Sequence, residues 1–255
     1  MRFAGRTAVV TGGAGGIGRA VCAGFAVEGA AVAVVDVDPA AVSDTVDGLV
    51  AAGGLAGGFA ADIADPGAVD ALMRRIHDEL TGPHILVTLA GGSLGTPRDL
   101  ADIEPDDLEL VLGVNVKGTF YCCQAAVPYL GRGPGGAIVT VSSIGGRQPS
   151  PVTGAPYAAA KAAIGGLTRR LARELGPSGV RVNAVAPGLF LTGRLQGMFD
   201  AMSAAEQREV LDAIPLGRMP ELREIVDPVL FLASEQASYI TGVTLDVNGG
   251  RYMPA

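Results

Sequence analysis

Residues 7–18 read TAVVTGGAGGIG, a short apolar run that passes directly into a loop made mostly of glycine. The apolar run predicts a buried strand, and a segment of helical period follows from Arg19 to Glu28. Glycines let backbone N–H groups approach a pyrophosphate, and the N-terminus of a helix adds partial positive charge. This strand, loop and helix therefore predict the first unit of an α/β fold.

The glycine loop fits two motif registers. Gly13-x-Gly15-x-x-Gly18 matches the general dinucleotide-binding fingerprint, and Gly12-x-x-x-Gly16-x-Gly18 matches a wider variant. A glycine-rich turn without a ligand would look the same, so the loop alone does not establish a site. A nucleotide-triphosphate P-loop is excluded, since no Gly-Lys-Ser/Thr follows.

An acidic residue, Asp36, ends the second apolar run, 18 positions after Gly18. This is near the spacing of about 20 at which a carboxylate binds an adenosine ribose. The same carboxylate would repel a 2′-phosphate, so NAD is favoured over NADP. Asp62, after the third apolar run, is a candidate for the adenine edge or an ordinary turn residue. A methyltransferase also binds adenosine with such a loop and acid, and it stays an alternative here.

Short apolar runs alternate with helical segments along all 255 residues. We therefore predict one α/β domain, a doubly wound Rossmann fold with helices on both faces of a parallel sheet of about seven strands. Pro39 and Pro66, each behind an aspartate, predict helix starts. Residues 188–218 lack a strand pattern and predict a substrate loop or lid. The predicted strands are Thr7–Thr11, Ala31–Asp36, Leu55–Ala61, Ile85–Ala90, Ala137–Ser142, Arg181–Ala186 and Val243–Val247.

Composition narrows the function classes. The net charge of -7, without a basic cluster, argues against nucleic acid as a partner. Three cysteines and two histidines show no metal-ligand spacing, so we expect no metal and a reducing compartment. No leader segment and no run of roughly 20 apolar residues is evident, so we expect a soluble, cytoplasmic protein without membrane contact.

A candidate catalytic pair occurs in the segment Tyr157-Ala158-Ala159-Ala160-Lys161, which opens a helix. Positions i and i+4 share a helix face roughly 6 Å apart. The charge of Lys161 is expected to lower the pKa of the Tyr157 phenol from about 10 towards about 7. Ser142 and Ser143 end the preceding predicted strand. This arrangement predicts a tyrosine that loses its proton more easily than usual.

With these residues the whole sequence resembles the short-chain dehydrogenase/reductase family. The wider glycine register is the one typical of that family. The further segments that resemble its motifs are Val114-Asn115-Val116-Lys117-Gly118, Asn183-Ala184-Val185-Ala186-Pro187-Gly188, Thr192 and Ile240-Thr241-Gly242.

The resemblance implies a role for each matching residue. Tyr157 is the general acid/base, Ser143 orients the substrate oxygen, and Asn115 anchors a proton-relay water. Lys161 tunes Tyr157 and holds the nicotinamide ribose. The resemblance also implies a secondary alcohol or ketone as the substrate. The expected cofactor-binding residues are Gly12, Gly16, Ile17, Gly18, Asp36, Asp62, Ala90, Gly91, Tyr157, Lys161, Pro187, Gly188 and Thr192.

Two departures from the family pattern occur. Thr88-Leu89-Ala90-Gly91 stands where an Asn-Asn-Ala-Gly segment is usual, and the interval from Ser143 to Tyr157, 14 positions, is one longer than usual. A catalytically silent NAD-binding sensor or scaffold is the alternative from another class, although the intact Ser143, Tyr157 and Lys161 argue against it.

The resemblance also implies a substrate pocket between Ser143, Tyr157, residues 92–98 and residues 188–218. An apolar lining predicts a hydrophobic or cyclic alcohol, and Arg98, Arg147 or Arg194 are candidates to bind an anionic group. The resemblance further implies a homotetramer or dimer. The expected subunit contacts are Leu110, Val114, Tyr121, Ala163, Gly165 and Gly166, and the expected pocket lining is Leu94, Leu189, Phe190, Leu191, Met198, Phe199 and Met202.

Overall fold

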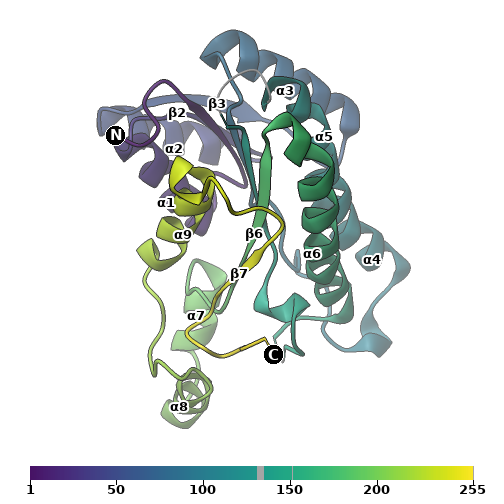
Figure 1. Ribbon diagram of the computed structural model, residues 1–255. Coiled ribbons are helices and arrows are strands. Elements are labelled where there is room, and N and C mark those ends of the chain that lie inside the picture. Colours follow the sequence, from purple (N-terminus) through teal and green to yellow (C-terminus); the bar gives the residue numbers. More distant parts are fainter. Residues whose placement is uncertain (131–134, 151, 255) are drawn as a thin grey trace.

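A seven-stranded parallel sheet forms the centre of the protein, with strand order β3-β2-β1-β4-β5-β6-β7 (Figure 1). The computed structural model describes residues 1–130, 135–150 and 152–254, without the side chains of Arg194 and Met198. The order reverses direction between β1 and β4, so the strand ends open a crevice there. The strands are β1 (Thr7–Thr11), β2 (Ala31–Asp36), β3 (Leu55–Ala60), β4 (Ile85–Thr88), β5 (Ala137–Val141), β6 (Arg181–Pro187) and β7 (Thr244–Val247).

Helices cover both faces of the sheet. In Figure 1, α1 and α9 lie on one side of it, and α3, α5 and α6 lie on the other. The doubly wound α/β fold predicted from the sequence is therefore confirmed. The helices are α1 (Gly16–Val27), α2 (Pro39–Ala51), α3 (Pro66–Leu80), α4 (Pro105–Leu112), α5 (Thr119–Leu130), α6 (Ala155–Leu175), α7 (Arg194–Asp200), α8 (Ala204–Asp212) and α9 (Arg223–Ala233). Short 3₁₀ turns lie at Leu100–Asp102, Ile144–Gly146, Gly176–Ser178 and Glu235–Ala237, and a π-helical turn, Gly113–Gly118, joins α4 to α5.

The strand β1 shows why its sequence is a continuous apolar run. Ala8 and Val10 enter the core under α1 and α9, whereas Val9 enters the core under α3 and α5. All three side chains are fully buried. A strand covered on both faces has no solvent side, so the alternation of polar and apolar residues disappears.

The local signals in the sequence place the strand ends within two residues, whereas α1 begins at Gly16, three residues before the predicted start at Arg19. Asp38 and Asp65 cap α2 and α3, each accepting hydrogen bonds from two first-turn N–H groups behind the expected prolines. The strands β3, β4 and β5 end earlier than predicted, β6 extends to Pro187, and β7 begins at Thr244. The residues concerned are mostly apolar, so the sequence pattern does not mark where each strand ends.

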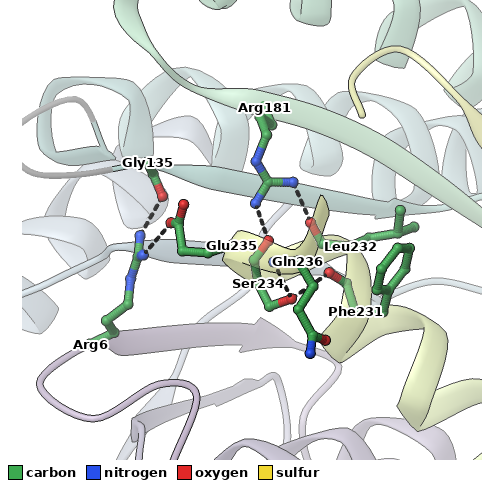
Figure 2. A network of polar contacts seen from close by, with 8 residues as sticks. All are labelled: Arg6, Gly135, Arg181, Phe231, Leu232, Ser234, Glu235 and Gln236. Atoms are coloured by element: carbon green, nitrogen blue, oxygen red, sulfur yellow. Dashed lines mark hydrogen bonds and ion pairs between the residues drawn. The ribbon is translucent and has the colours of Figure 1, made fainter. Parts of the chain in front are cut away.

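A polar network closes the amino-terminal edge of the sheet (Figure 2). Arg181, at the start of β6, donates hydrogen bonds to the carbonyl oxygens of Leu232 (2.7 Å) and Ser234 (2.9 Å) at the end of α9. Arg6 bonds to Glu235 and to the carbonyl of Gly135. A cation at the C-terminus of a helix satisfies carbonyl groups that lack helical partners. The network therefore fixes α9 against β6.

The helical stretch Pro105–Leu130 meets the length and composition of a membrane-spanning helix, contrary to the expectation of no such run. It comprises α4, the π-helical turn and α5, and 44% of its most apolar window is buried inside the protein. The core helix of a soluble protein has the same properties, so the stretch is weak evidence for a membrane span.

Candidate active site

A cavity of about 500 Å³ lies at the carboxyl ends of β1 to β4, beside the start of α1. Predicted cofactor residues supply much of its wall, and Leu89 and Val114 join them. Its size and position match those of a dinucleotide crevice in a doubly wound sheet. The predicted cofactor residues in its wall are Gly12, Gly16, Ile17, Gly18, Asp36, Asp62, Ala90, Gly91 and Thr192.

Glycine is required in the loop at the mouth of this cavity. Gly12 has a φ of +68°, and a Cβ atom there would lie 2.7 Å from the backbone nitrogen of Ala90. A Cβ atom on Gly18 would lie 1.9 Å from the carbonyl oxygen of Gly12. Gly15, the N-cap of α1, has no side chain to bond the first-turn N–H groups. The loop therefore offers backbone donors to an anion, and its residues fit a pyrophosphate.

Asp36 and Asp62 take up different environments on the cavity wall. Asp36 accepts hydrogen bonds from the backbone nitrogens of Ala14 (3.2 Å) and Val37 (2.8 Å), which fix its carboxylate beside the glycine loop. Asp62 accepts a hydrogen bond from the backbone nitrogen of Ala64 (2.8 Å) and so forms a turn of its own. Both interpretations of Asp62, turn residue and cavity residue, are thus compatible with its position.

Ser143 and Tyr157 meet in a second pocket of about 220 Å³. Ser143 follows the end of β5, and its hydroxyl accepts a hydrogen bond from the backbone nitrogen of Gly145 (3.1 Å). Tyr157 stands in the first turn of α6 and is hydrogen-bonded to Ser143. Ser142 instead donates to the carbonyl of Lys161 (2.7 Å), which makes Ser143 the serine at the pocket.

Lys161 lies behind Tyr157 rather than in the wall of either cavity. Its Nζ is 5.8 Å from the centroid of the Tyr157 ring and donates to the carbonyl oxygen of Val141 (2.9 Å). Burial lowers the pKa of Lys161 to about 8. The predicted contact between Lys161 and the nicotinamide ribose remains a prediction.

The pKa of Tyr157 is raised above its ordinary value by burial, while the hydrogen bond with Ser143 acts in the opposite direction. The expectation that Lys161 brings this pKa below its ordinary value is wrong for this structure. The physical reason is that the phenol loses hydration, while the ammonium group lies over the ring and bonds to a main-chain carbonyl.

Asn115 is fully buried in the π-helical turn between α4 and α5. Its side chain accepts a hydrogen bond from the backbone nitrogen of Gly92 (3.0 Å) and donates to the carbonyl oxygens of Gly92 (2.9 Å) and Val111 (2.9 Å). A Cβ atom on Gly91 would lie 2.4 Å from the Asn115 oxygen. Asn115 therefore holds the loop that separates the two cavities, and π-helical turns are common at functional sites.

Thr88 and Leu89 stand where the family usually has two asparagines, and Leu89 gives the cavity an apolar side chain at this place. Leu89 lines the cofactor cavity and packs against the core under α1. The hydroxyl of Thr88 is buried and has no hydrogen-bond partner among the described residues. Ala90 keeps a close approach to β1, because its backbone nitrogen donates to the Thr11 hydroxyl (3.3 Å).

The substrate pocket differs from its prediction. Leu189 lines it as expected, but Phe190 is 2% exposed and belongs to the core under α1 and α9. Phe190 follows the buried end of β6, so its side chain continues into the core. Leu94 lines the cofactor cavity instead. Leu191, Phe199 and Met202 do not line the pocket, and the Met198 side chain lies outside the described residues.

The candidate anion-binding arginines also differ from their prediction. Arg147 is ion-paired with Asp246 (3.0 Å) and lies 5.0 Å from the centroid of the Tyr252 ring. Arg98 lines a neighbouring pocket of about 210 Å³, and the Arg194 side chain lies outside the described residues. The arginine in the wall of the Ser143–Tyr157 pocket is Arg251.

Sequence reasoning missed Arg251, although a signal was present. Asn248-Gly249-Gly250 follows the last strand, β7, and the carboxyl ends of parallel strands meet at one edge of the sheet. Gly188 lines the same pocket, whereas Pro187, the last residue of β6, is buried and lines neither cavity.

Comparison with known proteins agrees with this geometry. A family model described as enoyl-(acyl carrier protein) reductase matches residues 12–251. A (3R)-3-hydroxyacyl-CoA dehydrogenase of Canis lupus familiaris is 39% identical, and the match covers 99% of this chain and 98% of that protein. A cyclohexanol dehydrogenase of Rhodococcus sp. (strain TK6) is 38% identical, with 96% of each chain covered.

Solved structures give the same result. A short-chain type dehydrogenase/reductase from Mycobacterium ulcerans has a TM-score of 0.92 and 31% identity, covering 98% of this chain and 91% of that one. A 3-oxoacyl-acyl-carrier-protein reductase from Brucella melitensis has a TM-score of 0.88 and 35% identity, covering 99% and 95%. These matches support neither the methyltransferase nor the silent scaffold. The chain belongs to the short-chain dehydrogenase/reductase family of oxidoreductases.

Proposed function

We propose that the protein is an NAD-dependent oxidoreductase that interconverts a secondary alcohol and a ketone. The observation that carries this proposal is the meeting of Ser143 and Tyr157 in one pocket, separated by the Gly91–Gly92 loop from a cavity that fits a dinucleotide. Relatives are named for hydroxyacyl-CoA and cyclohexanol substrates, which share a CH–OH group.

In the direction of oxidation, Tyr157 takes the proton of the substrate hydroxyl, and Ser143 hydrogen-bonds the same oxygen and orients it. A nicotinamide cofactor held in the cavity beside the glycine loop would supply the acceptor for the hydride of the carbinol carbon. The buried phenol must lose its proton before it acts as the base, and the raised pKa of Tyr157 opposes that loss. Lys161 is the cation that can offset this cost, provided that it holds its proton. Asn115 acts by positioning the loop at Gly92.

The preference for NAD rests on Asp36. Its carboxylate is fixed by two backbone N–H groups in the wall of the cavity, where an adenosine ribose would bind. A 2′-phosphate at that place would meet a negative charge. Val37, beside Asp36 in the wall, supplies no cation to compensate.

The substrate proposed here has an apolar body. Ile144, Val152, Leu189 and Leu195 contribute apolar wall to the pocket beside Ser143 and Tyr157. A hydrophobic secondary or cyclic alcohol fits such a lining better than a polyol sugar.

A homotetramer or dimer is also proposed. Leu108, Leu110 and Phe120 on α4 and α5 are 40%, 48% and 41% exposed, which leaves apolar surface for a second copy. Val114 and Tyr121 were also expected in the subunit contact. Val114 instead lines the cofactor cavity and Tyr121 packs against the core, so neither belongs to this exposed surface. Light scattering at micromolar concentration tests the proposal, and a monomer contradicts it.

The test of the main proposal is turnover of a cyclic alcohol, a polyol sugar and a hydroxy acid, followed by the absorbance of reduced cofactor. The wild type is compared with Tyr157→Phe, which keeps the ring and removes the hydroxyl. We expect NAD-dependent turnover that falls at least roughly 1,000-fold in the variant, while the melt shift caused by NAD is retained. Turnover that survives the substitution contradicts the role of Tyr157. A melt shift with S-adenosylmethionine and none with NAD contradicts the whole proposal.

A further inference from the structure

The pocket that holds Ser143 and Tyr157 continues into a neighbouring pocket of about 180 Å³. Gly188, Leu189 and Arg251 line both, so they form the boundary between the two. The wall of the neighbouring pocket is mostly apolar and includes the polar residues Asp246 and Asn248. A substrate whose hydroxyl lies at Tyr157 therefore has room for a second functional group beyond Arg251.

The charges around this boundary leave one cation without a counter-ion. Arg147 is ion-paired with Asp246 at 3.0 Å, and Arg218 is ion-paired with Glu224 at 2.6 Å. The Arg251 guanidinium forms no ion pair or hydrogen bond with the residues that the structure describes. It is only half-exposed, in the wall of a concave site. The net charge at the boundary is therefore a single positive charge on Arg251.

Arg251 is held in place by its own turn. The side-chain oxygen of Asn248 accepts hydrogen bonds from the backbone nitrogens of Gly250 (3.0 Å) and Tyr252 (3.3 Å), and the Arg251 nitrogen donates to the Asn248 carbonyl (3.2 Å). The backbone nitrogen of Leu216 donates to the carbonyl of Gly249 (3.2 Å), which ties the turn to the end of the 188–218 segment. These bonds fix the backbone from which the Arg251 side chain extends into the pocket wall.

We propose that Arg251 binds a carboxylate of the substrate, so that the protein acts on a secondary alcohol with an apolar body and an acid group remote from the carbinol carbon. This inference rests on the proposed function. A guanidinium binds a carboxylate through two parallel hydrogen bonds. The single uncompensated charge matches a monoanion, whereas a phosphate dianion would leave a negative charge in the half-buried site.

The experiment uses hydroxy acids of the form CH₃–CH(OH)–(CH₂)n–COO⁻, with n from one to four, and the methyl ester of each. For the best acid we expect kcat/KM in the wild type to exceed that of its ester. Arg251→Gln is expected to lower kcat/KM for that acid roughly 100-fold, mainly through KM, and to change the ester value less than roughly threefold. Arg251→Lys keeps the charge and is expected to recover part of the loss.

A matched control is Arg169→Gln, which removes one exposed positive charge from α6 outside both substrate pockets. It is expected to leave both kcat/KM values unchanged. Equal loss for acid and ester in Arg251→Gln overturns the proposal, as does a wild type that prefers the esters. A larger loss for the phosphate monoester of the matching diol than for the acid overturns the choice of carboxylate.

A binding measurement separates this proposal from the proposed function. The shift in melting temperature caused by hexanoate, with hexanamide as the neutral comparison, requires no turnover. We expect hexanoate to stabilise the wild type more than hexanamide does and Arg251→Gln to remove that difference. The absence of any difference in the wild type overturns the anion site. Absence of NAD-dependent turnover of all the alcohols overturns the proposed function instead.

Discussion

Lys161 and Arg181 are buried cations at opposite edges of the same sheet, and their partners differ. At the amino-terminal edge, Arg181 donates through both terminal nitrogens to carbonyl oxygens at the end of α9 (Figure 2). At the carboxyl edge, Lys161 donates to the carbonyl of Val141 and lies beside the ring of Tyr157. A lysine ammonium has three donors, so two lack a protein partner among the described residues. Among the described residues, Arg181 therefore bonds two carbonyl oxygens through two nitrogens, whereas Lys161 bonds one carbonyl oxygen.

The two buried cations differ in how the protein replaces their lost hydration. Burial lowers the pKa of both groups, but Arg181 compensates for lost hydration with bonds that also cap a helix. Lys161 replaces its lost hydration with one hydrogen bond, so its burial has a cost in stability. Removing the two cations should therefore produce opposite effects on activity and stability.

The largest expected effect is on turnover in Lys161→Met, which keeps much of the side-chain length. Without a cation behind the ring, the Tyr157 phenolate loses a nearby positive charge, and we expect kcat to fall roughly 1,000-fold. Steady-state kinetics with NAD and the best alcohol measure the effect. A variant that retains more than about a tenth of the wild-type kcat shows that Lys161 does not assist proton transfer.

Arg181→Met is expected to act on stability instead. The substitution leaves the carbonyls of Leu232 and Ser234 buried without their donors, and each such group costs roughly 1–3 kcal/mol. We expect the free energy of unfolding to fall by about 3 kcal/mol, with kcat nearly unchanged at a temperature where the variant is folded. Urea unfolding measures the loss. Arg169→Gln, exposed on α6, is the control and should stay within about 0.5 kcal/mol of the wild type.

The contrast also explains which parts of the protein the sequence reveals. Local sequence patterns predict the elements that carry the glycine loop, Asp36, Tyr157 and Lys161. The order of the strands then places these residues at the carboxyl edge of the sheet. Arg181 carried no such signal, because its partners lie more than 50 positions away in sequence. The same holds for Arg147 and Asp246, whose pairing depends on how the segments after β5 and in β7 meet. Phe190 was misassigned since an apolar residue in a loop fits a pocket or a core equally well.

The third prediction concerns the nucleotide end of the site. Asp36→Ala removes the charge that would repel a 2′-phosphate and the acceptor for the ribose, so we expect the preference for NAD over NADP to fall roughly 10- to 100-fold. The ratio of kcat/KM for the two cofactors measures it. Asp38→Ala is a neighbouring control of equal charge, because Asp38 caps α2 and is not in the cavity wall. A wild type that uses NADP more efficiently contradicts the cofactor assignment.

The smallest expected effect is the contribution of Lys161 to the pH dependence of the free energy of unfolding. Burial lowers its pKa from the ordinary value of 10.5 to about 8 in the folded protein, so between these values the unfolded chain binds more protons than the folded one. Stability therefore rises with pH across this window, and the rise that Lys161 contributes between pH 7 and pH 9 is about 1 kcal/mol. Lys161→Met lacks this contribution and should be more stable than the wild type at pH 7, with the two converging as the pH rises. Urea unfolding of both proteins at pH 7, 8 and 9 measures the difference, and other titrating groups cancel in it. A difference that is constant with pH would show that Lys161 keeps its proton and its ordinary pKa in the folded protein, and the contrast with Arg181 would then rest on hydrogen bonding alone.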